Sequence, residues 1–112
     1  MAENRKLFLD DGTPRYIQCR DAGAELNDRY TVWFTGRHRA LPAGRVAYRA
    51  MSDRPFHPLG FGVWGEQDRR DCRGYPGGKR IGFSDLPPDC RRLVLDDYRT
   101  IWRVAPTAER SA

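Results

Sequence analysis

Two segments near the middle of the chain alternate apolar and polar side chains with a period of two. The repeating apolar positions are Tyr30, Val32 and Phe34 in residues 30–35, and Val46, Tyr48 and Ala50 in residues 46–51. This period is typical of half-buried strands in an antiparallel sheet. We therefore predict that the two segments pair through a loop over 36–45. The same alternation predicts that Trp33 and Arg49 share the opposite face.

A second pattern, with helical periodicity, runs from about Pro88 to Arg103. One broad apolar arc contains Cys90, Leu93, Val94, Leu95, Tyr98, Ile101 and Trp102. Prolines and acidic residues at the start are typical of a helix N-terminus. We therefore predict a C-terminal amphipathic helix. Asp97 lies at the edge of the arc, where we expect it to anchor the helix through an arginine of the sheet.

Weaker signals complete the predicted sheet. Asp11-Gly12 lies between residues 6–10 and 15–20, which is typical of a hairpin turn. Residues 80–83 form a short strand candidate. The sequence thus predicts an α+β fold with a small antiparallel sheet of four to five strands and one C-terminal helix. We expect a single domain over residues 1–112, with flexible tails at 1–5 and 105–112.

Residues 53–78 show no periodicity. They contain six glycines and three prolines, together with Phe56, Phe61, Trp64 and Tyr75. Disordered segments are poor in aromatic residues. We therefore predict a long, ordered, aromatic and glycine-rich loop, and loops of this length are commonly functional.

Composition narrows the class of protein. The net charge is +5, the isoelectric point is near 9.5, and all but two of the 20 basic residues are arginine. This is consistent with nucleic-acid binding, but a GC-rich genome that encodes arginine in place of lysine explains it more simply. No apolar run approaches the ~20 residues of a membrane span. The three isolated cysteines do not form a disulfide pattern. We expect a cytoplasmic protein that does not act at a membrane.

Motifs for metal, cofactor and nucleophilic chemistry are missing from the sequence. Cys19, Cys72 and Cys90 are isolated, so neither they nor the two histidines show zinc-ligand spacing. Residues 74–80 differ from a phosphate-binding loop at the positions that define it. We therefore predict no metal site and no cofactor.

Two sets of candidate functional residues remain. His57, Glu66 and Arg54 lie in the 53–78 segment and contain the residue types of a small hydrolase or nuclease. The second set would form a basic and aromatic sheet face that grips nucleic acid through phosphate contacts and base stacking. Its members are Trp33, Arg37, Arg39, Arg45 and Arg49.

Several stretches together resemble a small family of prokaryotic proteins with no assigned activity. They are YTV at 30–32, MSDRPFHPLGFG at 51–62, KRIGFSDLPPDC at 79–90, LVLDDY at 93–98 and IW at 101–102. The resemblance implies a bacterial, plasmid or phage domain and adds nothing about mechanism. Since no catalytic motif is present, our first hypothesis is a non-enzymatic binding or regulatory protein that acts on a protein partner. Nucleic-acid binding is second, and a hydrolase with a site in residues 53–78 is third.

Overall fold

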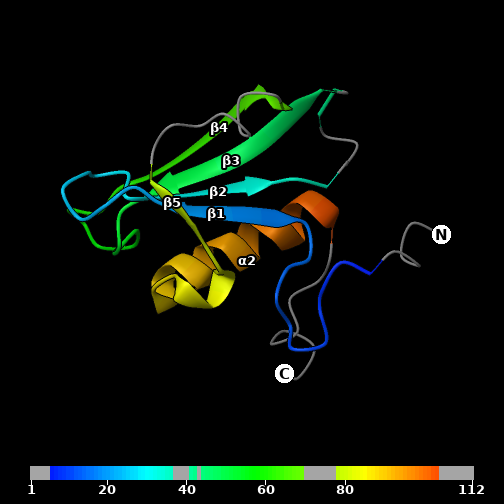
Figure 1. The fold of residues 1–112 in the computed structure, drawn as a ribbon, viewed down its shortest axis with the longest axis horizontal. Helices are drawn as coiled ribbons and strands as arrows, with labels where there is room; N and C mark the ends of the chain where they lie inside the picture. Colours follow the sequence, from blue (N-terminus) through cyan, green and yellow to red (C-terminus); the bar gives the residue numbers. More distant parts are fainter. Residues whose placement is uncertain (1–5, 37–40, 43, 70–77, 104–112) are drawn as a thin grey trace.

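The fold is a five-stranded antiparallel sheet with one helix packed across one of its faces (Figure 1). The computed structural model describes residues 6–36, 41–42, 44–69 and 78–103. The strands follow the spatial order β4-β3-β2-β1-β5. The elements are β1 (Ile17–Asp21), β2 (Tyr30–Phe34), β3 (Arg45–Met51), β4 (Gly62–Asp68), β5 (Lys79–Ile81), η2 (Phe83–Asp85) and α2 (Pro88–Trp102). The predicted α+β class is confirmed, and the two predicted tails lie outside the described residues.

Strands β2 and β3 pair as predicted. Their register, however, places different side chains on the same face from those that we predicted. Val32 is opposite Arg49, and Trp33 is opposite Tyr48. Residues directly opposite one another share a face. Arg49 therefore lies on the same face as Val32, and the prediction that it shares a face with Trp33 is wrong. Alternation within a strand does not fix how two strands align, and a one-residue shift exchanges the faces.

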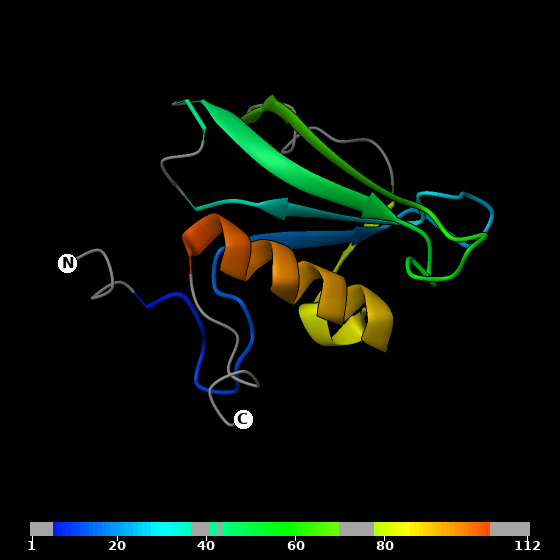
Figure 2. The same ribbon diagram turned by 180° about the vertical axis from the view of Figure 1, so that it is seen from behind.

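Helix α2 closes the principal core. Its buried side chains Cys90, Val94 and Tyr98 pack against the sheet face that carries Val32 and Phe34. Figure 2 shows the molecule from behind, and in this view too α2 lies across this face. The helix ends at Arg103, which adopts a left-handed conformation with a φ of 57°. The predicted helix and its apolar arc are confirmed.

The N-terminal turn docks onto this helix. The Leu9 amide donates to the Thr13 carbonyl, which closes the predicted turn, and Phe8 forms a single bridge with Pro14. The Tyr98 hydroxyl donates to the Leu7 carbonyl, and the Phe8 ring meets the Tyr98 ring edge-on. These contacts attach the turn to the end of α2 by packing rather than by a long hairpin.

The prediction of one continuous loop over 53–78 is wrong, because residues 62–68 form strand β4. This strand pairs with β3 along its whole length, from Met51 opposite Gly62 to Arg45 opposite Asp68. No described strand lies on its other side. An edge strand need not bury an apolar face, so β4 lacks the alternation that identifies β2 and β3. Residues 70–77 lie outside the described part.

In the portion of the chain that the structure describes, no helix has both the length and the apolar character to cross a bilayer.

Candidate functional site

The outer edge of β4 presents backbone hydrogen-bonding groups. The Ser52 amide donates to the Phe61 carbonyl at 2.8 Å, and the Arg69 amide donates to the Gly44 carbonyl at 2.7 Å. Hydrogen-bonded and non-hydrogen-bonded pairs alternate along an antiparallel ladder. Odd-numbered residues from 61 to 69 therefore bond to β3. The N–H and C=O groups of the even-numbered residues Gly62, Trp64 and Glu66 point outward.

Large apolar side chains are exposed on β4 and on the loop that precedes it. Among the described residues, six large apolar side chains are exposed to solvent, and four of these six lie within residues 56–64. We call these four the edge patch: Phe56 (46% exposed), Leu59 (91%), Val63 (42%) and Trp64 (42%). Val63 and Trp64 are adjacent in a strand and so face opposite sides of the sheet. The patch therefore wraps around the strand rather than covering one face.

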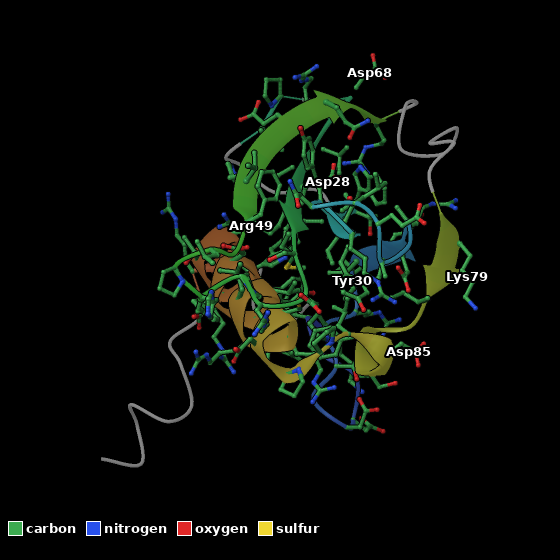
Figure 3. All side chains as sticks on the ribbon, turned by 90° about the vertical axis from the view of Figure 1, so that its left-hand side faces the viewer. Asp28, Tyr30, Arg49, Asp68, Lys79 and Asp85 are labelled. Carbon is green, nitrogen blue, oxygen red and sulfur yellow. The ribbon has the colours of Figure 1, made fainter. Side chains whose placement is uncertain are left out.

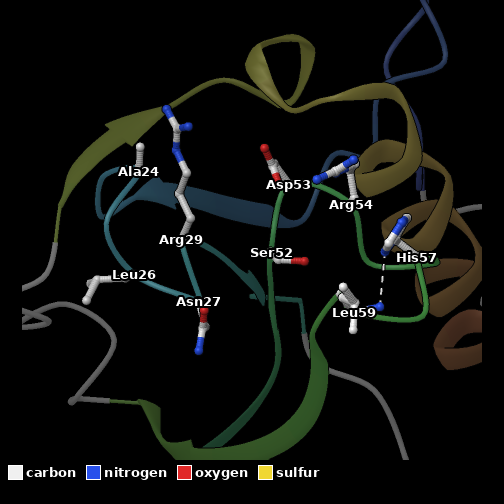
Figure 4. A pocket seen from close by; sticks show the side chains of 10 residues that line it. Ala24, Leu26, Asn27, Arg29, Ser52, Asp53, Arg54, His57 and Leu59 are labelled. Atoms are coloured by element: carbon white, nitrogen blue, oxygen red, sulfur yellow. Dashed lines mark hydrogen bonds between the residues drawn. The ribbon is translucent and has the colours of Figure 1, made fainter.

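Loop 52–61 holds Leu59 outward through two consecutive turns. The His57 amide donates to the Arg54 carbonyl at 3.1 Å, and the Gly60 amide donates to the His57 carbonyl at 2.7 Å. A side chain at Gly60 would overlap the Arg54 carbonyl oxygen, so the turn requires glycine there. The Leu59 amide donates to Nδ1 of His57 at 3.0 Å (Figure 4). His57 thereby accepts a hydrogen bond that shapes the loop.

A shallow pocket of about 250 Å³ lies between this loop and residues 24–29 (Figure 4). Leu26, the fifth exposed apolar side chain, and Leu59 both line it. Arg29 on the same wall is held by Asp21 through bonds of 2.8 and 3.1 Å. The Arg29 guanidinium in turn lowers the pKa of the Asp21 carboxyl. The pocket is thus a fixed, mixed polar and apolar hollow beside the edge patch.

The hydrolase candidates do not converge. Arg54 and His57 line the pocket, whereas Glu66 is not among its ten lining residues. Glu66 is exposed on β4, four residues beyond Gly62. At 3.3 Å per residue this displacement is about 13 Å along the strand. The described residues therefore provide no joint site for these three side chains.

Trp64 stands over the ion pair that joins sheet and helix. Its ring centroid is 5.5 Å from that of Phe34, and the Arg49 guanidinium carbon is 5.2 Å from the Trp64 ring centroid. Arg49 makes two bonds with Asp97 of α2, at 2.7 and 2.8 Å. The predicted anchoring of the helix by Asp97 is confirmed. Burial raises the pKa of the Asp97 carboxyl, and the Arg49 guanidinium opposes that rise.

The predicted basic and aromatic face is not assembled by the described residues. The Trp33 side chain is fully buried, and its indole N–H donates to Gln67 Oε1 at 2.8 Å. Arg49 is on the other face in the pair with Asp97. Arg45 is directly opposite Asp68 across β3 and β4. Arg37 and Arg39 lie outside the described residues.

The two described cysteines are free, buried thiols. Burial raises the pKa of both Cys19 and Cys90 to about 12, and the Cys90 thiol donates to the Ser52 carbonyl. Within residues 6–36, 41–42, 44–69 and 78–103, no three His, Cys, Asp or Glu side chains gather into a group that would hold a metal ion. Cys72 lies outside these ranges. The prediction that the protein binds no metal remains a prediction.

Comparison with known proteins yields no match: no family model, no curated protein and no solved structure resembles this chain. The function must therefore be argued from the site itself. The sequence reasoning missed the edge strand. The apolar group Phe61, Val63 and Trp64 between glycines, followed by acidic Glu66 and Asp68, is the signal that would have indicated it.

Proposed function

We propose that this protein is a non-enzymatic binding or regulatory protein that holds an extended segment of a partner protein along the outer edge of β4. The observation that carries the proposal is the concentration of exposed apolar side chains on β4 and on the loop before it. Four of the six such side chains among the described residues lie within residues 56–64. Exposed apolar side chains that gather in one region of a protein are a mark of interaction sites.

The backbone geometry favours strand addition as the binding mode. In strand addition, main-chain hydrogen bonds supply affinity and alternate side chains supply specificity. Main-chain hydrogen bonds can form with the outward N–H and C=O groups of Gly62, Trp64 and Glu66. Side-chain specificity can come from contacts with the edge patch. A partner segment of matching chemistry has apolar side chains near Trp64 and a basic side chain near Glu66.

The other two hypotheses have less support. The hydrolase hypothesis required His57 and Glu66 in one cleft, and the pocket contains only the first. The nucleic-acid hypothesis required Trp33 and Arg49 on one accessible face, and they lie on opposite faces. Neither hypothesis accounts for the apolar surface of residues 56–64.

Selection of peptides from a random displayed library against the full chain tests the proposal. We expect the selected peptides to bind wild type and Leu9→Asp with equal affinity and Leu59→Asp about tenfold more weakly, because the substitution places a charge in an apolar contact. Leu9 is the matched control because it is an exposed leucine, at 46%, in the N-terminal turn. Equal binding to Leu59→Asp would contradict the proposal.

A further inference from the structure

Two arginines lie side by side at the edge of the sheet opposite β4. Arg20 on β1 and Arg80 on β5 are direct register partners in an antiparallel pair. Their Cβ atoms are therefore expected about 5 Å apart on one face. That face is the one opposite α2, because the neighbouring residues Cys19 and Ile81 point into the core beneath the helix. Figure 3 shows β5, marked by Lys79, at the edge away from Arg49 and β4.

Within the described part of the chain, no carboxylate pairs with either arginine, Arg20 or Arg80. Arg20 donates from Nη1 to the Gly78 carbonyl at 3.3 Å. Its Nε is buried and has no hydrogen-bond partner, the one such buried side-chain atom among the described residues. Arg80 is exposed, so the pair is reachable from solvent.

Both features oppose folding unless an anion is present. Like charges directly opposite one another destabilise a sheet. A buried donor without a partner retains its full desolvation penalty, and such an atom in a folded protein commonly marks a site for water or an ion. One oxyanion bound between the two guanidiniums would remove the repulsion, and the unpartnered Nε belongs to one of these two guanidiniums. The two observations are independent, and they point to the same ligand.

We propose that Arg20 and Arg80 form a binding site for a phosphate group. Arginine presents a planar fork of donors that matches phosphate oxygens. Two guanidiniums balance a phosphate monoester, which has a charge of about −1.5 to −2 at neutral pH, whereas one guanidinium is sufficient for a carboxylate. Thr31 lies opposite Arg20 on the same face and adds a hydroxyl to this row. The site is at the other edge of the sheet from β4, so it stands independently of the proposed function.

Thermal unfolding of the full chain in inorganic phosphate, with chloride at matched ionic strength as the reference, tests the site. We expect phosphate at tenfold excess over its Kd to raise the Tm of wild type by about 6–10 °C. Arg80→Gln and Arg20→Gln should each weaken phosphate binding by about tenfold or more. Arg15→Gln is the matched control, because Arg15 is an exposed arginine in the N-terminal turn. It should respond to phosphate like wild type.

The Tm values of the variants can also be compared in the absence of phosphate. In chloride alone, Arg80→Gln should have a higher Tm than wild type because the repulsion with Arg20 is removed, and a purely structural role of Arg80 predicts a lower one. Short oligothymidylates with and without a 5′-phosphate identify the source of the phosphate. Binding of both indicates the phosphodiester backbone, binding of the phosphorylated one alone indicates a monoester, and binding of inorganic phosphate alone indicates a free ion. Equal Tm shifts in phosphate and chloride, or an unchanged response in Arg80→Gln, would overturn the proposal.

Discussion

The half of the molecule under α2 and the half around β4 use apolar side chains in opposite ways. Beneath the helix, Val32, Phe34 and Val94 are at most 1% exposed. Around β4, Leu59 is 91% exposed and Trp64 is 42% exposed. The first arrangement stabilises the fold by removing apolar area from water. The second leaves apolar area in contact with water, which is why we connect it to binding.

The largest contrast should appear when one buried and one exposed apolar side chain are each truncated. Phe34→Ala removes a buried side chain beneath α2 and should destabilise the protein by about 3–5 kcal/mol. Leu59→Ala should change the free energy of unfolding by no more than about 0.5 kcal/mol. Urea unfolding of both variants measures the difference. Similar losses for the two would show that loop 52–61 is packed and that the edge patch is not a surface.

The pair that connects the halves should come next in size. Asp97→Ala leaves the largely buried Arg49 guanidinium without its two bonds and should cost about 2–3 kcal/mol. Arg92→Ala is the control on the same helix, since its contact with Asp89 is long, at 3.7 Å, and exposed. It should stay within about 0.5 kcal/mol of wild type. The reverse order in thermal unfolding would mean that Arg49 and Asp97 do not anchor the helix.

Two glycines of β4 give a matched test of how the edge strand packs. A Cβ at Gly65 would lie 2.5 Å from the Tyr48 hydroxyl oxygen, so Gly65→Ala must displace that ring and should cost about 1–3 kcal/mol. A Cβ at Gly62 would meet Leu93 at 3.7 Å, an ordinary contact. Gly62→Ala should therefore leave stability unchanged or raise it slightly. Equal effects in chemical denaturation would place β4 in a different register.

The smallest effect is a dependence of stability on alkaline pH. Cys19 and Cys90 have a thiol pKa of about 12 in the folded protein and about 9 when unfolded. The unfolded state therefore loses these protons first, so the stabilisation is fully present below pH 9 and falls as the pH rises towards 12. The slope from each thiol is near zero at pH 8, about half a proton at pH 9 and close to one proton, or about 1.4 kcal/mol per pH unit, just above pH 10. Urea unfolding between about pH 8 and 10.5 should show that Cys90→Ala removes this growing contribution, and an unchanged pH dependence would contradict the assigned pKa.

The sequence predicts the half of the molecule under α2 better than the half around β4, and the reason is physical. Periodicity arises when one side of an element is buried and the other is not. It therefore identified 30–34, 45–51 and the helix to within one or two residues, together with the role of Asp97. It failed at residues 62–68, because an edge strand with both faces partly exposed has no such contrast. Periodicity also failed to predict which side chains share a face with Trp33, because this depends on the register between strands.

The candidate site was harder to predict than the fold. His57 was singled out as a catalytic candidate, and its ring accepts a hydrogen bond in the turn that carries Leu59. Glu66 was singled out as a catalytic partner, and it lies on β4 away from the pocket. Arg20 and Arg80 are 60 positions apart, and only the pairing of β1 with β5 brings them together. Single-sequence patterns do not contain that information.

Amide hydrogen exchange along β4 tests most directly whether its outer edge is the binding site. In the isolated protein, the amides of Val63, Gly65 and Gln67 should exchange slowly because they bond to β3. Those of Trp64 and Glu66 should exchange rapidly because they point outward. With a selected peptide bound, the amides of Trp64 and Glu66 should become protected while the odd-numbered ones stay as they were. Continued rapid exchange of Trp64 and Glu66 in the complex would contradict strand addition at β4.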